Sequence, residues 1–234
     1  MLHESTEIGR ALTADEEARI MAACRVSRSR SLYPAVLVST HTAVRNKELR
    51  LLRWHQIDLI GRSLTVGTSK TEGGTGRVVP LNDAATQCLK EWRAQFPEAK
   101  PSHFVFPSER YGFDGEKGHL QGAVVRYNVR PSVPIGSWKV AWTNARTSAG
   151  VKCRWHDLRH TFVSKLAEGM VSDTTITSIA GWMSKKMMER YSHSSNEAKR
   201  RAVAILDRIP EPEIQGSPQT PHSRSRRLHA TYIK

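Results

Sequence analysis

Cysteine is scarce in this sequence of 234 residues. The three cysteines, Cys24, Cys88 and Cys153, lie far apart and form no C-x-x-C pair. This spacing indicates neither a disulfide framework nor a zinc site. We therefore expect reduced thiols that are buried or partly buried.

Long apolar stretches and internal repeats are missing as well. No apolar run approaches the length of a membrane span, and the polar residues 1–10 lack the apolar centre of a signal peptide. These absences predict a soluble, intracellular protein without a membrane partner. The length suits one main domain with a tail.

Acidic residues are few relative to basic ones, because 22 Asp and Glu stand against 36 Lys and Arg, a net charge of +14. The tail from residue 210 onward adds little, since it holds four basic and two acidic residues. Such a surplus favours a polyanionic partner, because neutralised phosphates release condensed counterions. Nucleic acid is the leading candidate, and acidic lipid or a merely solubilising cationic surface is the alternative.

The first part of the chain predicts helices. Residues 12–25 begin with Thr13 as N-cap and Glu16 three positions later, the pattern of a capping box before an amphipathic helix. Residues 32–45 are mostly apolar, which predicts a buried helix with Pro34 in its first turn.

A change of period then predicts β structure. After a short helix over 46–54, residues 58–81 carry β-branched residues at strand spacing around a glycine-rich link at 71–76. This pattern predicts a β-hairpin, with a third strand near 56–59. Residues 83–96 return to helical spacing, with Asn82 or Asp83 as the cap.

The second half is less regular. Phe104 to Phe106 predict a brief extended piece, and residues 111–136, rich in Gly, Pro and charge, predict a long loop or a hairpin. A further helix is expected over 137–150, with a stop at Gly150. Two or three helices are expected within 155–193, and one more over 197–209. The fold class is therefore α+β, mainly α, with a small antiparallel sheet.

Two basic residues of the first half are candidates for binding an anion. Arg45 stands where a buried helix gives way to the next one, and Glu48, three residues on, is suited to hold its guanidinium. Lys70 stands at the end of a strand before the glycine-rich link, where it can bind phosphate or deliver a proton. An ordinary Arg–Glu pair and an exposed turn lysine are the alternatives.

The stretch 155–193 carries the remaining candidates. His156 and Arg159 are three apart, so on a helix they share one face. Trp182 can donate its indole N–H to a phosphate oxygen or fill the core. Tyr191 is a weak nucleophile unless cations stabilise the phenolate, and Arg45 and Arg159 together with Lys70 would supply that field. No cluster of Asp and Glu spaced as metal ligands accompanies them.

These residues resemble the catalytic domain of the tyrosine recombinases, the phage integrase family, from about Leu12 to Ile209. The segment TAVRNKELRLLRWHQID is similar to the family's first-arginine motif, and TSKTEGGTGRVVPL to its β-hairpin with the catalytic lysine. HDLRHTF is similar to its His-x-x-Arg box, and GWMSKKMMERYSH to its final box. The resemblance assigns catalytic roles to Arg45, Lys70, His156, Arg159, Trp182 and Tyr191, with Glu48 as the supporting acid.

The resemblance implies a site-specific recombinase that works without metal, ATP or any other cofactor. Tyr191 would attack a DNA phosphodiester to give a 3′-phosphotyrosyl link and a free 5′-hydroxyl. Arg45 and Arg159 would clamp the non-bridging oxygens with help from Trp182, His156 would assist proton movement, and Lys70 would protonate the leaving oxygen. The partner would be double-stranded DNA, on which the chain would form a tetramer in the synapse, with accessory proteins that bend the DNA. The protein would act in the prokaryotic cytoplasm, at the nucleoid.

The chain departs from the family pattern in places. Trp182 stands where His is common, and Ala43 stands where Gly is usual, a change that suits a negative φ. We expect a lead at 1–11, the catalytic domain at 12–209 and a disordered tail at 210–234, without the family's N-terminal core-binding domain. By analogy, the helix at 197–209 is expected to dock on another subunit.

Two other functions compete with recombination. A type IB topoisomerase would relax DNA with a similar pocket, although the chain length and the motifs favour a recombinase. A non-catalytic remnant of an integrase would only occupy DNA sites, although it would have no need of a phenol at this spacing.

Overall fold

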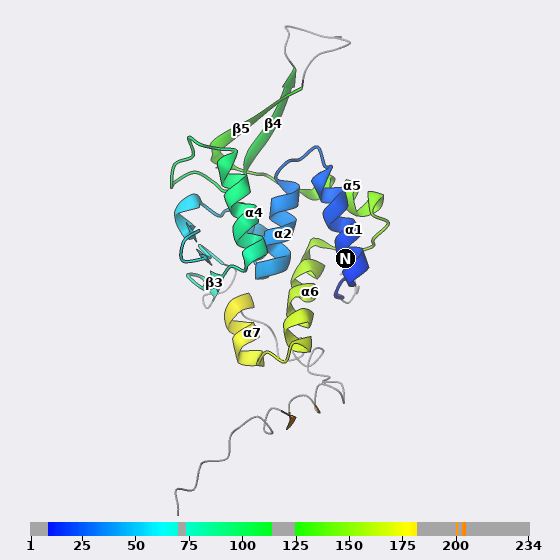
Figure 1. The fold of residues 1–234 in the computed structure, drawn as a ribbon. Helices are drawn as coiled ribbons and strands as arrows, with labels where there is room; N and C mark the ends of the chain where they lie inside the picture. The colour runs from blue at the N-terminus through cyan, green and yellow to red at the C-terminus, as the bar shows by residue number, and fades with distance from the viewer. Residues whose placement is uncertain (1–8, 70–73, 114–124, 182–199, 201–202, 205–234) are drawn as a thin grey trace, which may run out of the picture.

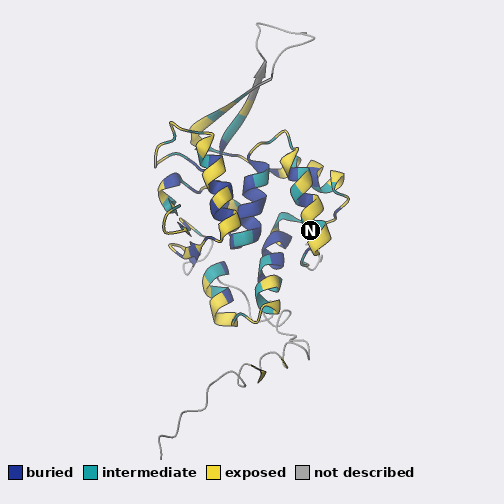
Figure 2. Cartoon of the chain, in the orientation of Figure 1, coloured by how far each residue is buried: buried dark blue, intermediate teal, exposed yellow. Residues whose placement is uncertain are grey.

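The computed structural model describes residues 9–69, 74–113, 125–181, 200, 203 and 204. Helix α2 (Leu32–Thr42) occupies the centre of the molecule, as Figure 1 shows. It packs against α1 (Ala14–Arg25), α4 (Asp83–Ala94) and α6 (Trp155–Glu168). Nine of its eleven residues are buried, and Figure 2 shows the helix almost entirely dark blue. This confirms the buried helix expected from its all-round apolar sequence.

The helix ends agree with the capping residues in the sequence. The Oγ1 of Thr13 accepts a hydrogen bond from the backbone N–H of Glu16, and the Glu16 carboxylate accepts one from the N–H of Thr13. This reciprocal pair is the expected capping box of α1. Asn82, one of the two candidates, caps α4 by accepting a bond from the N–H of Ala85.

A three-stranded antiparallel sheet lies beside α4 (Figure 1). It is formed by β1 (Ile57–Asp58), β2 (Ser63–Thr65) and β3 (Val78–Pro80), in that order. Leu64 pairs with Val79, and both side chains are fully buried. The expected hairpin and its third strand are therefore confirmed.

A second hairpin projects from the body of the molecule near the N-terminal end of α2 (Figure 1). It consists of β4 (Pro107–Phe113) and β5 (Val125–Pro134), so the hairpin was the correct alternative for this irregular stretch. Glu109 anchors it, because its carboxylate accepts bonds from Ser29 Oγ at 2.6 Å and from the Ser31 N–H at 2.8 Å.

Stacked aromatic rings fix the start of α6. Helix α5 (Lys139–Ser148) follows Trp138 and ends before Gly150, the stop that the sequence predicted. The φ of Gly150 is 64°. Trp138 lies parallel to Trp155, the first residue of α6, with ring centroids 5.1 Å apart, and meets Phe106 edge to face at 5.4 Å. Such pairs add stability beyond the area they bury.

Helix α7 (Asp173–Ala180) follows α6 and packs against it and against β3. These two helices agree with the two or three expected between residues 155 and 193. Of the helix expected over 197–209, which is the proposed docking segment, the structure describes only residues 200, 203 and 204, and the tail lies outside the described residues.

The three cysteines are buried free thiols, as expected. Burial raises the pKa of Cys24 and of Cys88 to about 12, and that of Cys153 to about 11. Within the described residues, no helix is both long and apolar enough to cross a membrane.

Candidate active site

Arg45 stands at the junction between α2 and α3 (Asn46–Arg50), where the sequence predicted it. It is the N-cap of α3, and its backbone N–H donates to Glu48 Oε2 at 3.0 Å. Its guanidinium Nη1 lies 2.9 Å from Glu48 Oε1. The helix start therefore brings the supporting acid back onto Arg45 by the geometry of a capping box.

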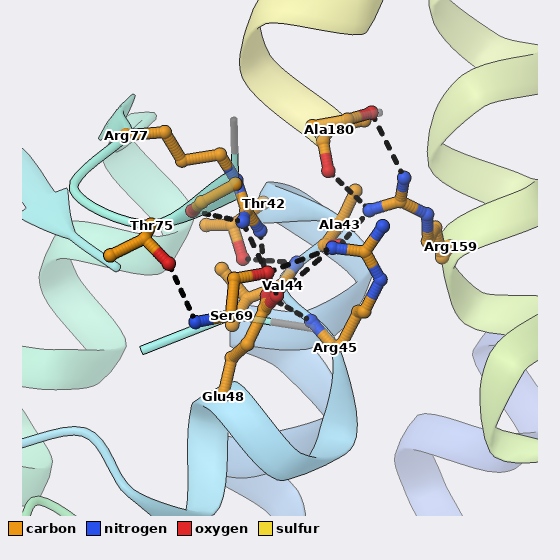
Figure 3. A network of polar contacts seen from close by, with 12 residues as sticks. Thr42, Ala43, Val44, Arg45, Glu48, Ser69, Thr75, Arg77, Arg159 and Ala180 are labelled. Atoms are coloured by element: carbon orange, nitrogen blue, oxygen red, sulfur yellow. Dashed lines mark hydrogen bonds and ion pairs between the residues drawn. The ribbon is translucent and has the colours of Figure 1, made fainter. Parts of the chain in front are cut away.

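Glu48 is the centre of a buried polar network, shown in Figure 3. Besides Arg45, it accepts a hydrogen bond from Ser69 Oγ at 2.6 Å and from Arg77 Nη2 at 2.7 Å. Burial of Glu48 raises the pKa of its carboxyl, but the bonds from Arg77, Ser69 and the Arg45 backbone outweigh this and lower the pKa to about 2. Glu48 is therefore a permanent anion at neutral pH, matched by two guanidinium groups.

Arg159 enters the same region from α6. It is 3% exposed, and its Nη1 donates to the carbonyl of Ala43 at 2.9 Å and to the carbonyl of Ala180, while Nη2 donates to that of Gly181 at 3.3 Å. The last carbonyls of a helix have no intrahelical partner and carry its negative dipole end. Arg159 therefore fastens the end of α7 to the end of α2 (Figure 3).

His156 lies one turn before Arg159 on α6, as the spacing predicted. His156 is exposed to solvent, and its ring meets that of His160 edge to face, with ring centroids 5.1 Å apart. Loss of hydration against the neighbouring protein lowers the pKa of His156 below its usual value, and the charges of Arg159 and, more weakly, Arg45 lower it further. The imidazole is therefore neutral at pH 7, with both arginines within electrostatic reach.

The backbone at Ala43 corrects one expectation. Ala43 has a φ of 54°, so it lies in the left-handed region and not at the negative φ that would suit a residue other than glycine. Alanine is tolerated here because its methyl group is fully buried, packed among Val163, Ile176 and Ala180. Burial of the methyl offsets part of the left-handed strain, about 1–2 kcal/mol.

Three predicted site residues, Lys70, Trp182 and Tyr191, lie outside the described residues. The structure does describe the residue that precedes two of them in sequence. Ser69, before Lys70, donates to Glu48, and Gly181, before Trp182, accepts from Arg159. Of the predicted site residues, the structure describes Arg45, Glu48, His156 and Arg159. Arg45 contacts Glu48, and both arginines lie within electrostatic reach of His156.

Sequence reasoning missed Arg77 and Ser69. A signal for Arg77 was present, because strand periodicity places Arg77 on the same face as Val79 and Leu81, and all three residues are buried. A buried arginine in a strand pattern requires an acidic partner. For Ser69, a hydroxyl in an exposed-looking turn, the sequence carries no comparable signal.

Two guanidinium groups, with a neutral imidazole within their electrostatic reach, form a site that can hold a phosphate and accept a proton. Comparison with known proteins decides the family, because a model of the phage integrase family matches residues 10–198. The chain belongs to this family. The integrase-family assignment agrees with the resemblance found from the motifs.

Two curated relatives give the same indication. The integrase of Salmonella phage P22 is 29% identical over 153 residues, which are 65% of this chain and 36% of the relative. A shufflon-specific DNA recombinase of Escherichia coli is 29% identical over 185 residues, 79% of this chain and 40% of the relative. The integrase-family chain therefore spans less than half the length of these relatives.

The fold agrees with that of solved integrases. The Tn1549 transposon integrase, solved in complex with circular intermediate DNA, superposes with a TM-score of 0.61 at 18% identity, covering 86% of this chain and 67% of that one. Together with the arrangement of helices and small antiparallel sheets, this confirms the α+β fold of a tyrosine recombinase catalytic domain.

Proposed function

We propose that this integrase-family chain is a site-specific recombinase that cuts and rejoins double-stranded DNA through a covalent link to Tyr191. The observation that carries the proposal is the convergence of Arg45, His156 and Arg159 beside Glu48. Positioned cations at a reacting phosphate act in a partly desolvated site, where each removed donor typically costs about 100- to 1,000-fold in rate.

In the proposed first step, the Tyr191 oxygen attacks phosphorus and its proton passes to His156, which is neutral at pH 7 because its pKa is lowered. The bond from phosphorus to the 5′ oxygen breaks, and Lys70 supplies the proton that makes the 5′-hydroxyl. Arg45 and Arg159 hold the non-bridging oxygens, and Trp182 donates its indole N–H to one of them.

Rejoining is the reverse of this step with the 5′-hydroxyl of a partner strand. The phosphotyrosyl ester conserves the energy of the broken phosphodiester, so the scheme requires neither ATP nor a metal ion. The electrostatic stabilisation that a metal would give is assigned to Arg45, Arg159 and Lys70.

Double-stranded DNA is the proposed partner, which the net charge of +14 supports. The name of the shufflon-specific DNA recombinase and the DNA complex of the Tn1549 transposon integrase support it as well. We further propose that the chain acts at the nucleoid as a tetramer, with the helix expected over 197–209 docked on a neighbour and accessory proteins that bend DNA. The unit at 12–209 would carry the chemistry.

A nicked duplex tests the chemistry directly, because loss of the short cleaved strand traps the covalent adduct. The parent chain and the Tyr191→Phe variant are incubated with such duplexes carrying candidate attachment sequences, and adducts are resolved on a denaturing gel. Tyr127→Phe is the matched control, since its hydroxyl lies 3.3 Å from Glu109 on the second hairpin.

The proposal expects an adduct from the parent and from Tyr127→Phe and none from Tyr191→Phe. Salt-sensitive DNA binding without any adduct from the parent would contradict it and favour the non-catalytic remnant. Relaxation of supercoiled DNA at random sequences, with no joining of partner strands, would favour the topoisomerase alternative.

A further inference from the structure

Arg77, which none of the sequence motifs includes, contacts several separate segments of the chain. It lies just before β3 with a side chain that is 5% exposed. Its Nη2 lies 2.7 Å from Glu48 Oε2 and its Nη1 lies 3.3 Å from Oε1. The same Nη1 donates to the carbonyl of Gly74 at 3.0 Å, and Nε donates to the carbonyl of Ile179 at 3.2 Å.

These contacts join three parts of the site. Glu48 belongs to α3, Gly74 to the link between β2 and β3, and Ile179 to the last turn of α7. A guanidinium offers five N–H donors in a rigid planar fork, so one arginine can bind all three segments at once. Lysine would keep the charge but not this geometry.

The end of α7 is held by two arginines side by side. Arg77 binds the carbonyl of Ile179, and Arg159 binds those of the next two residues, Ala180 and Gly181. The guanidinium of Arg77 also lies against Gly181, where an added Cβ would be in van der Waals contact with it at 3.4 Å. The chain continues from Gly181 directly to Trp182.

We propose that Arg77 is a positioning residue for DNA cleavage, which acts through Glu48 on Arg45 and through the carbonyl of Ile179 on the end of α7. The inference rests on the proposed function, because it concerns the same site. Arg77 engages both oxygens of Glu48, whereas the guanidinium of Arg45 reaches Oε1 at 2.9 Å. Without Arg77, the Glu48 carboxylate loses the guanidinium that shares its charge, so it would draw the fork of Arg45 more strongly, away from the phosphate.

The Arg77→Gln variant removes the charge and the fork, and Arg77→Lys removes only the fork. The matched control is Arg62→Gln, which breaks an exposed ion pair between Arg62, just before β2, and Asp83, the first residue of α4. Three quantities are compared in the full chain: DNA affinity, the single-turnover rate of adduct formation, and the pKa of the Glu48 carboxyl from ¹³C NMR titration. Circular dichroism and chemical denaturation check that each variant is folded.

Positioning predicts that Arg77→Gln slows adduct formation by about 100-fold, the scale of a misplaced site, while DNA affinity changes little. It also predicts that the pKa of Glu48 rises from about 2 toward its usual value in Arg77→Gln and not in Arg62→Gln. If Arg77→Gln does not fold, Arg77→Lys carries the test, and slower cleavage at unchanged affinity is expected from it. In a double variant with Glu48→Gln, the slowing should be less than the product of the two single effects, because both changes break the same Arg77–Glu48 pair.

Cleavage at the parent rate in Arg77→Gln or Arg77→Lys would overturn the inference, as would a pKa of Glu48 that stays near its parent value in Arg77→Gln. Equal slowing in the Arg62→Gln control would also overturn it. If neither the parent nor any variant forms an adduct, the proposed function fails instead. The NMR titration, together with the amide shifts of Ile179 and Gly181, then still decides whether Arg77 holds Glu48 and the end of α7.

Discussion

The guanidinium of Arg159 and the backbone carbonyl of Ala43 are joined by a hydrogen bond of 2.9 Å between residues 116 positions apart. This bond makes the orientation of Arg159 depend on the left-handed turn at the end of α2. A backbone conformation at one residue therefore contributes to the placement of a proposed catalytic side chain.

The turn at Ala43 can be tested by substitution with residues of different bulk. In Ala43→Gly, relief of about 1–2 kcal/mol of strain is offset by loss of a buried methyl and by the freedom glycine gains on unfolding, each about 0.5–1 kcal/mol. The free energy of unfolding should therefore change by less than about 1 kcal/mol. Ala43→Val should lose about 2 kcal/mol or more, because a β-branched side chain at positive φ is strained and overfills the site. Urea denaturation measures both, and equal stability of the two variants would refute this account.

Removal of Glu48 should destabilise the protein strongly. In Glu48→Ala, two guanidinium groups lose the carboxylate that neutralises them in a buried site, a change that typically costs about 3–5 kcal/mol. Glu91→Ala is the matched control, since Glu91 is exposed and pairs with Gln87 on the surface of α4, and a change within about 0.5 kcal/mol is expected. The free energies come from chemical denaturation at neutral pH. A loss in Glu48→Ala as small as in the control would show that the network adds little stability.

Acid should weaken the protein through His160. Burial, followed by the neighbouring His156, lowers the pKa of His160 from 6.5 to about 4. The unfolded chain then binds a proton more readily than the folded chain, so stability falls as the pH drops from about 6.5 to about 4. A shift of this size corresponds to about 3 kcal/mol. The slope of unfolding free energy against pH in this window should flatten in His160→Gln and persist in His55→Gln, a change at an exposed histidine. An unchanged slope in His160→Gln would assign the acid sensitivity to other groups.

Arg159→Lys should impair cleavage more than binding. A lysine cannot reach the carbonyls of Ala43 and Gly181 together, so the end of α7 loses part of its attachment. The rate of adduct formation on the nicked duplex should fall about 100-fold or more, as for loss of a phosphate donor. Arg19→Lys, which changes an exposed arginine paired with Asp15, should keep the parent rate. A full rate in Arg159→Lys would contradict the proposed role.

Much of the fold follows from local sequence pattern. The all-round apolar run of α2, the capping box at Thr13 and the glycine after α5 each predict an element that the structure contains. The second hairpin was ambiguous because β4 and β5 pair mainly with each other, so their sequence shows no clean alternation between a buried and an exposed face.

The site was predictable where the motif and the chemistry coincide. The spacing of three predicted the contact between Arg45 and Glu48 and the shared helix face of His156 and Arg159. The resemblance placed the two pairs in one site, and His156 lies within electrostatic reach of both arginines. The partners of Arg159 were not predictable, because they are backbone carbonyls, which every residue possesses. The same is true of Ala43, whose φ is set by the tertiary contacts of its methyl and carbonyl groups and not by its own preference.

The burial of the cysteines has a practical consequence for experiments on this protein. All three thiols have a raised pKa and lie within the core, so maleimide reagents that attack thiolates should leave them largely unmodified in the folded chain. A single cysteine introduced at an exposed position, such as Asn128→Cys on β5, would then take up a dye selectively. Fluorescence would then test whether chains assemble on DNA as proposed, with all native cysteines retained.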